Sequence, residues 1–219
     1  MQKKNCESVF NKIKELGLRR SLERAAQKIT HFVYRKIGLS VRLNTADRVM
    51  LDEVILPFFT SNQDVRRVLF VGCDYYTAHY PAMFYNAECW TIEPRPSKAK
   101  YGGNPHIIAL IQDIDSYAES ETFDLIICNG VYGWGLDRKQ DLEQAFAACF
   151  VCLKFGGFLL LGWNNVPERT PVPLESLESL NAFAHWNFPG LGGWRIPTGS
   201  ETGHVFDFYR KLETVSSRP

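Results

Sequence analysis

The chain has 219 residues, of which 45% are hydrophobic and 22% are charged. This composition is typical of one packed α/β domain with an extension, or of two small domains, and it excludes a chain that is disordered throughout. The formal net charge of +1 excludes nucleic-acid binding that depends on the overall charge of the chain.

Positive charge is concentrated at the start of the chain. Residues 1–42 contain eleven Lys and Arg against three Glu, which is a net charge of +8, so the remainder carries about −7. From Leu22 to Ile37 apolar residues recur at helical spacing, with basic residues on the other faces. We predict a basic helical extension over residues 1–60, packed on a main domain over residues 61–219. Docking of this arm on a membrane surface or on a partner is the alternative.

The six cysteines favour a reducing compartment, because most of them lie in apolar runs that predict burial. The opening residues run into a charged segment with no continuous apolar signal region, and no apolar run approaches the roughly 18 residues of a membrane span. We therefore expect a cytoplasmic protein without a transmembrane segment. Cys149 and Cys152 have helical spacing but lie among Phe and Leu residues, so no metal site is predicted.

Residues 46–59 have a helical pattern, and we expect this first helix to stop near Pro57. After it, short apolar runs alternate with further helical patterns. The runs predict strands at 67–72, 89–93, 106–111, 123–129, 158–163 and 204–210, and the helical spacing predicts helices at 141–154 and 174–184. Such alternation predicts an α/β domain with a doubly wound, mostly parallel sheet. In these sheets ligands bind beyond the carboxyl ends of the strands, so the residues that follow each strand are the candidates for a site.

Four segments within residues 65–165 resemble class I S-adenosylmethionine-dependent methyltransferases. Val68-Leu-Phe-Val-Gly-Cys-Asp74 resembles the glycine-rich first loop, and Glu93 follows the second strand, where the family has an acid. Phe123-Asp-Leu-Ile-Ile-Cys-Asn-Gly130 resembles the fourth strand, and Leu153-Lys-Phe-Gly-Gly-Phe-Leu-Leu-Leu161 resembles the turn into the fifth. The resemblance implies a Rossmann-like sheet of seven strands that ends in an antiparallel hairpin, with S-adenosylmethionine as cofactor.

The resemblance also implies where the cofactor binds. Glu93 would hold the ribose hydroxyls, and the whole predicted set is Gly72, Cys73, Asp74, Glu93, Gln112, Asp113, Asn129 and Gly130. The first loop departs from the family, because Phe70, Asp74 and Tyr76 stand where an acid and two glycines are usual. Asp74 either pairs with the amino group of the cofactor or caps a helix, and both interpretations remain open here.

The methyl acceptor is expected beside the segment Tyr132-Gly-Trp-Gly-Leu-Asp137, which follows the fourth strand. Trp134 between two glycines forms either a platform for the acceptor or a lid on the sheet edge. The predicted substrate-binding residues are Tyr132, Trp134 and Asn164. If the acceptor is a hydroxyl, Asp137 or His204 would be the catalytic base, although a lone histidine is more often structural.

These features together predict a methyltransferase that acts on a small molecule, with a sugar or another hydroxyl-bearing metabolite as the preferred acceptor. No Asn-Pro-Pro-Tyr-like motif follows the fourth strand, so no nucleic-acid substrate is expected. A non-catalytic interaction module is the alternative, because the first loop is degenerate. A nicotinamide dehydrogenase is disfavoured, because the Gly-x-Gly-x-x-Gly spacing is absent. Nothing in the pattern predicts an oligomeric state.

Overall fold

The structure is a computed structural model that describes residues 41–212. The chain divides into one unit that ends at Val41 and a compact second unit that begins at Arg42. Most of the predicted basic arm, including the helix over Leu22–Ile37, lies outside the described residues. Residues 46–61 are helical and belong to the second unit, so this unit begins well before the boundary that we predicted at residue 60.

A single mixed sheet forms the centre of the second unit. Its strands are β1 (Arg67–Val71), β2 (Glu88–Ile92), β3 (His106–Ile107), β4 (Phe123–Asn129), β5 (Leu153–Asn164), β6 (Ala184–His185), β7 (Arg195–Pro197) and β8 (His204–Arg210). The order is β3-β2-β1-β4-β5-β8-β6, and β7 also pairs with β8. Strands β1 to β5 are parallel, and β8 is antiparallel to β5. The doubly wound, mostly parallel sheet is therefore confirmed, with eight strands instead of seven because of β7.

Helical segments connect the strands. They are α2 (Ala46–Met50), the π-helix η1 (Leu51–Ile55), α3 (Leu56–Ser61), α4 (Tyr80–Met83), α5 (Lys139–Cys152), α6 (Glu178–Asn181), and the 3₁₀ helices η2 (Pro96–Tyr101), η3 (Ile111–Ser116), η4 (Pro167–Arg169) and η5 (Leu174–Ser176). The first helix continues past Pro57 to Ser61, contrary to our prediction. Pro57 stands in the first turn of α3, directly after the π-helix, where a missing N–H is tolerated.

Two predicted elements are shorter in the structure. Strand β3 ends at Ile107 instead of residue 111, and the exposed side chains of Ile108 and Leu110 follow it. The helix predicted over residues 174–184 is a 3₁₀ turn followed by the four-residue helix α6. In the second segment Leu177, Leu180 and Phe183 are nevertheless buried, because burial of a side chain does not require a regular helix.

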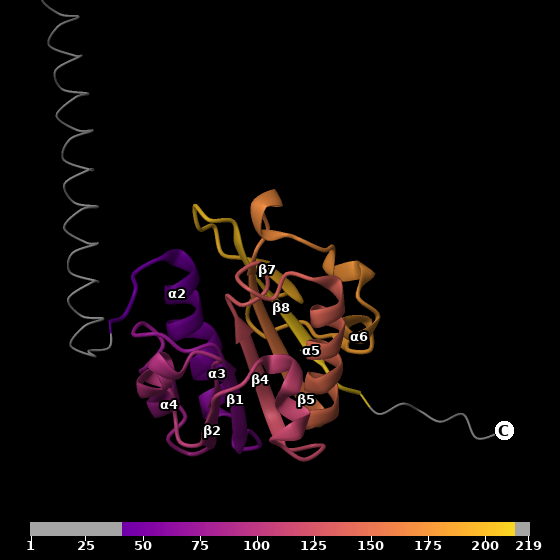
Figure 1. The fold of residues 1–219 in the computed structure, drawn as a ribbon. Coiled ribbons are helices and arrows are strands. Elements are labelled where there is room, and N and C mark those ends of the chain that lie inside the picture. Colours follow the sequence, from indigo (N-terminus) through magenta and orange to yellow (C-terminus); the bar gives the residue numbers. More distant parts are fainter. Residues whose placement is uncertain (1–40, 213–219) are drawn as a thin grey trace, which may run out of the picture. The chain divides into compact units, whose positions relative to one another are not determined.

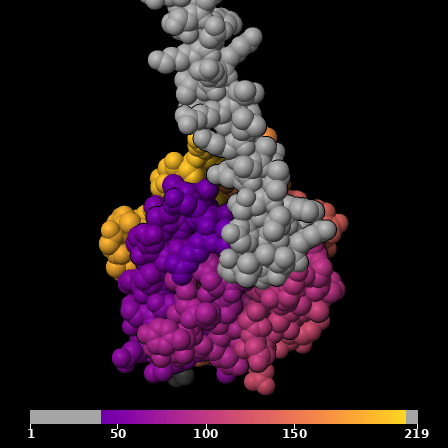
Figure 2. Space-filling model, turned by 90° about the vertical axis from the view of Figure 1, so that its left-hand side faces the viewer, coloured from indigo at the N-terminus to yellow at the C-terminus, as the bar shows by residue number. Residues whose placement is uncertain are grey.

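Helices cover both faces of the sheet (Figure 1). On one face α5 and η3 pack against inward residues of the strands, such as Ile126 and Leu159. On the other face α2, η1, α3 and α4 pack against residues such as Leu125 and Phe70. In Figure 2 the indigo residues of this first helical segment lie against the magenta part of the chain that follows β1. Because neighbouring residues of each strand alternate between the two cores, the sheet is buried on both sides.

The strand order places a reversal point beside β1. The chain first builds outward through β2 and β3, and then returns to add β4 and β5 on the opposite side of β1. The loops that follow β1 and β4 therefore diverge at the carboxyl edge of the sheet and leave a crevice between them. None of the helices within residues 41–212 is long and apolar enough to cross a membrane.

Candidate functional site

A cavity of about 360 Å³ lies at this carboxyl edge, between the loops that follow β1, β2, β3 and β4. Its walls contain seven of the eight residues that we predicted for the cofactor: Gly72, Cys73, Asp74, Glu93, Gln112, Asn129 and Gly130. Asp113 does not line the cavity. Of the three predicted substrate-binding residues, only Trp134 lines it.

The first loop begins at Gly72, whose backbone has φ +85. Its N–H donates to the carbonyl of Ile92, 2.8 Å away, which joins the ends of β1 and β2. A side chain at this position would meet only Val131, at 3.5 Å, so conformation and not space favours glycine here. The Cys73 thiol is protonated at neutral pH, because burial raises its pKa to about 11. It is therefore not a nucleophile.

Glu93 is almost fully buried, with 2% of its surface exposed. One carboxylate oxygen accepts a hydrogen bond from the Cys73 N–H at 3.2 Å, and the other accepts from the backbone N–H and the Nε of Arg95 at 3.2 and 2.6 Å. Burial acts to raise the pKa of Glu93, but the bonds from Arg95 and Cys73 outweigh it and lower the pKa. Glu93 is thus an ionised carboxylate that ties the first loop to the end of β2.

Asp74 faces Lys98, which comes from η2. The Lys98 Nζ lies 2.6 Å from one Asp74 oxygen, and both side chains are largely shielded from solvent. The other oxygen accepts from the Tyr75 N–H at 2.9 Å, while the Asp74 N–H donates to Thr77 Oγ1. Asp74 therefore organises the turn and also contributes charge to the cavity. Lys98 and Arg95 line the cavity too, and sequence reasoning missed both, because nothing in their local pattern distinguishes them from surface residues.

Asn129 ends β4 with a side-chain amide that is buried and has no hydrogen-bond partner at either its oxygen or its nitrogen among the described residues. The amide occupies the space left by Gly162 on β5, since a Cβ there would lie 2.0 Å from the Asn129 Oδ1. Buried amides without partners are uncommon, because each lost hydrogen bond costs about 1–3 kcal/mol. An unpaired amide on a residue of the cavity wall is a candidate hydrogen-bond partner for a ligand.

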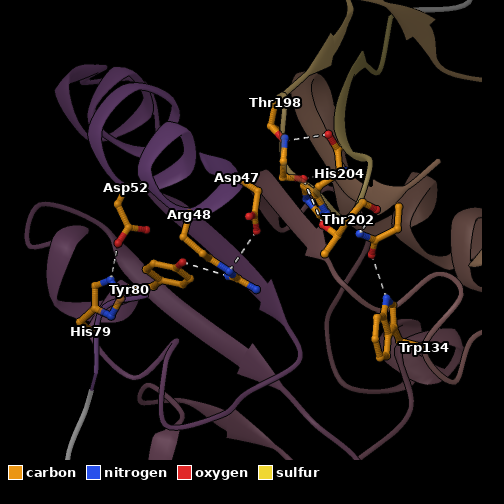
Figure 3. Close-up of polar contacts among 11 residues, drawn as sticks. Asp47, Arg48, Asp52, His79, Tyr80, Trp134, Thr198, Thr202 and His204 are labelled. Carbon is orange, nitrogen blue, oxygen red and sulfur yellow. Dashed lines mark hydrogen bonds and ion pairs between the residues drawn. The ribbon is translucent and has the colours of Figure 1, made fainter. Parts of the chain in front are cut away.

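Trp134 forms the wall of the cavity beyond β4, and 56% of its surface is exposed. Its indole N–H donates to the Asn164 Oδ1 at 3.0 Å, and the Asn164 amide nitrogen donates to the carbonyl of Thr202 (Figure 3). The Arg169 guanidinium lies over the indole ring, 3.4 Å from its centroid. Asn164 therefore supports Trp134 through this hydrogen bond. It does not line the cavity, contrary to our prediction.

Tyr132 and Asp137 are also outside the cavity. Tyr132 is fully buried, and its hydroxyl donates to the carbonyl of Val172. Its ring packs edge to face on Trp163, so it belongs to the core. Asp137 is exposed and accepts a long 3.4 Å hydrogen bond from the Gly135 N–H. Neither residue therefore has the role that we predicted for it. The direction of their side chains depends on the turns at Gly133 and Gly135, and hydrophobic periodicity does not predict such turns.

His204 is buried at the start of β8, next to α2 (Figure 3). Its Nε2 has no hydrogen-bond partner among the described residues. Burial lowers the pKa of His204 to about 4, with a smaller contribution from Arg48 that Asp47 opposes. The imidazole is therefore neutral at physiological pH. It does not line the cavity, so the structure does not place it as a base on a ligand there.

Helix α2 reaches the site through Arg48. The Arg48 Nη1 bonds to the Tyr80 hydroxyl at 3.0 Å, and its guanidinium lies 4.9 Å from the ring centroid of Tyr76, which lines the cavity. The segment before the sheet thus supports the first loop from outside. Within residues 41–212 no group of His, Cys, Asp and Glu side chains is arranged to hold a metal ion.

No protein-family model and no curated protein matches the sequence. Solved structures do match the fold. The N-methyltransferase NodS from Bradyrhizobium japonicum, solved with S-adenosylhomocysteine, has a TM-score of 0.55 and 15% identity, over 76% of this chain and 93% of that one. A TehB-like S-adenosylmethionine-dependent methyltransferase from Corynebacterium glutamicum has a TM-score of 0.55 and 16% identity, over 86% and 97%.

A third match is 1,6-didemethyltoxoflavin-N1-methyltransferase from Burkholderia thailandensis, solved with 1,6-didemethyltoxoflavin and S-adenosylhomocysteine. It has a TM-score of 0.50 and 14% identity, over 87% of this chain and 90% of that one. At these identities the likeness concerns the fold. The chain has the fold of the class I S-adenosylmethionine-dependent methyltransferases, with a cavity at the carboxyl edge of its sheet.

Proposed function

We propose that this protein is an S-adenosylmethionine-dependent methyltransferase that acts on a small hydroxyl-bearing molecule. The observation that carries the proposal is the convergence of Gly72, Glu93 and Asn129 on one cavity at the reversal point of the sheet. The volume of about 360 Å³ lies within the range of small-molecule and cofactor sites. The fold shared with known methyltransferases supports the same assignment.

The residues present fit the cofactor. Glu93 is ionised and would accept the ribose hydroxyls in exchange for its bond to the Arg95 side chain, which is 64% exposed and free to move into solvent. Asp74 would accept a hydrogen bond from the amino group of the methionine moiety, in competition with Lys98. The apolar residues Ile92, Leu110 and Ile111 line the part of the cavity that follows β2 and β3, where a flat adenine would be covered.

The protein contributes mainly alignment to the reaction. Bound S-adenosylmethionine supplies a methyl group that is already activated by its sulfonium. Transfer then requires an in-line approach of the acceptor, and alignment of this kind contributes roughly 7–11 kcal/mol in the best cases. Asn129 offers an amide donor and acceptor at the end of β4, and Trp134 offers a rigid apolar face next to it. Trp134 would also exclude water from the transferring methyl.

Trp134 and Asn129 form the part of the cavity wall where we place the methyl acceptor. A sugar is favoured because an exposed indole is a common platform for the apolar face of a sugar ring, and because the Asn129 amide can bond to a hydroxyl. Asp137 and His204 do not reach the cavity, so neither is retained as the base that we had considered. The proton of the acceptor hydroxyl would then pass to water or to a side chain that moves closer when the acceptor binds.

Calorimetry on the full chain tests this proposal. S-adenosylmethionine and S-adenosylhomocysteine should each bind with a dissociation constant in the micromolar range, and NADH, the control, should not bind. Both sulfur compounds should also raise the melting temperature by mass action. Absence of heat and of a thermal shift with both would end the methyltransferase assignment and favour a non-catalytic interaction module.

A further inference from the structure

The loop that carries Trp134 is held more firmly than its exposure would suggest. Arg169, from η4, donates through Nη1 to the carbonyl of Gly133 at 3.0 Å. A Cβ on Gly133 would lie only 2.2 Å from the Arg169 carbonyl oxygen, so the two loops also touch through their backbones. Together with the bond to Asn164, these contacts fix an indole that is more than half exposed. Such a rigid exposed ring is suited to receive a ligand.

Arg169 covers one face of this ring. Its guanidinium carbon lies 3.4 Å from the ring centroid, which is well within the range of a cation–π contact. Trp134 lines the cavity and Arg169 does not, so the cation lies against a residue of the cavity wall without lining the cavity itself. The ring is therefore already engaged with one positive charge before a ligand binds.

Arg169 has no carboxylate within ion-pairing distance in the described part of the chain. The exposed carboxylates of Asp137 and Glu168 make no such pair with it. The charged residues of the cavity itself, by contrast, neutralise one another, as Glu93 pairs with Arg95 and Asp74 with Lys98. Arg169 is thus the unpaired cation beside the Trp134 face.

We infer that Arg169 determines the charge of the acceptor, so that the site accepts neutral or anionic acceptors and rejects cationic ones. A cationic ligand in contact with Trp134 would lie within several ångströms of the guanidinium, and like charges at such separations repel even at surface dielectric values. A carboxylate in the same position would be attracted. Acidic or neutral sugars are therefore better acceptors than amino sugars. This inference rests on the proposed function.

The test uses three monosaccharides of similar shape and different charge: glucuronate, methyl glucoside and glucosamine. Binding to the ¹⁵N-labelled full chain, with S-adenosylhomocysteine present, is followed through the indole N–H signal of Trp134. A Trp134→Phe variant identifies this signal among those of the five tryptophans. We expect glucuronate to bind roughly five- to tenfold more tightly than glucosamine, with methyl glucoside between them.

Two variants of Arg169 and one control assign the preference. Arg169→Gln should bring the three dissociation constants to within about twofold of one another, whereas Arg169→Lys, which retains the charge, should keep their order. The control, Arg138→Gln, removes an exposed arginine that pairs with Asp141 and should leave the preference unchanged. The melting temperature of each variant shows whether it is folded. If Arg169→Gln does not fold, the order of the three dissociation constants in the wild type and in Arg169→Lys still tests the inference.

Three outcomes would overturn the inference: equal binding of the three sugars to the wild type, a preference for glucosamine, or a preference that persists in Arg169→Gln. A Trp134 signal that none of the sugars perturbs would also overturn it, because Trp134 would then not face the acceptor. Failure of the proposed function is recognised separately, since it appears as absence of S-adenosylhomocysteine binding in calorimetry, where no sugar is needed.

Discussion

Two groups of polar residues lie on opposite faces of the sheet, on strands β4, β5, β7 and β8, and differ in how well their hydrogen bonds are satisfied. On the face of α5, the carboxylate of Asp207 is fully buried. It accepts from the Arg195 Nε and Nη2, both at 2.8 Å, and from the Trp163 indole N–H at 3.0 Å. The Tyr209 hydroxyl approaches it at 3.4 Å. Every group in this cluster has a partner.

On the face of α2, Asn129 and His204 have buried side-chain polar atoms that lack hydrogen-bond partners among the described residues. These atoms are the oxygen and the nitrogen of the Asn129 amide and the Nε2 of His204. Strand alternation places both residues on the side of the sheet that α2, η1 and α3 cover.

The difference separates the structural cluster around Asp207 from Asn129, whose unpaired amide belongs to a cavity-lining residue. Arg195 belongs to β7, so its two bonds to Asp207 attach β7 to β8 and stabilise the sheet edge. Unpaired groups such as Asn129 lower stability, and they persist where a ligand supplies the missing partners. If this interpretation is right, substitutions in the first cluster should mainly change the free energy of unfolding. Substitution of Asn129, which lines the cavity, should mainly change binding.

The largest effect is expected at Asp207. Asp207→Ala leaves the Arg195 guanidinium and the Trp163 N–H without their buried partner, and should lower the free energy of unfolding by about 3–5 kcal/mol. Urea denaturation measures this loss. The control is Asp137→Ala, an exposed carboxylate, which should change stability by no more than about 0.5 kcal/mol. Equal effects of the two substitutions would contradict a structural role for the Asp207 cluster.

His204 should make stability depend on pH. Its pKa is about 4 in the folded protein against an ordinary value of 6.5, so the unfolded chain binds the proton more tightly. The resulting stability is present above the ordinary pKa and is lost as the pH falls from there towards 4, by roughly 3 kcal/mol in total. Denaturation at several pH values should show a smaller loss in His204→Gln than in the wild type. Parallel curves for the two proteins would refute this assignment.

Glu93 should affect the cofactor more than the fold. If Glu93 holds the ribose as we propose, Glu93→Gln removes the charge that strengthens these hydrogen bonds and should weaken S-adenosylhomocysteine binding by about 1.5–3 kcal/mol, which is ten- to a hundredfold. Glu88→Gln is a matched control at the other end of β2, because Glu88 is exposed and pairs with Arg67 on the surface. Calorimetry that finds the same dissociation constant for both variants would make Glu93 a structural residue.

The smallest change in stability is expected at Asn129. A small change would distinguish its unpaired amide from the fully bonded carboxylate of Asp207. Because the amide has no partners to lose, Asn129→Ala should leave the free energy of unfolding within about 1 kcal/mol of the wild type, or raise it. Methyl transfer to an accepted sugar should nevertheless fall. A large loss of stability in urea denaturation would mean that the amide is satisfied in solution and belongs with the structural cluster.

The sequence by itself determined the doubly wound sheet and most of one cavity wall. Runs such as residues 123–129 are apolar on both faces, which only a strand buried between two layers explains. Gly72, Glu93 and Asn129 could be located because a ligand site at the ends of parallel strands follows from the strands alone. These properties are local, so they could be recognised without knowing which distant segments meet.

Only the tertiary structure decided the partners across the chain. Lys98 pairs with Asp74, which is 24 residues away in the sequence. Arg169 bonds to Gly133 in the Trp134 loop, which is 36 residues away. Tyr132 is buried although it adjoins exposed Trp134, because the positive φ values of Gly133 and Gly135 turn the loop sharply. Such contacts depend on where loops converge after the sheet has formed. Hydrophobic periodicity specifies regular elements, whereas the direction of a loop side chain depends on the surfaces that happen to surround it.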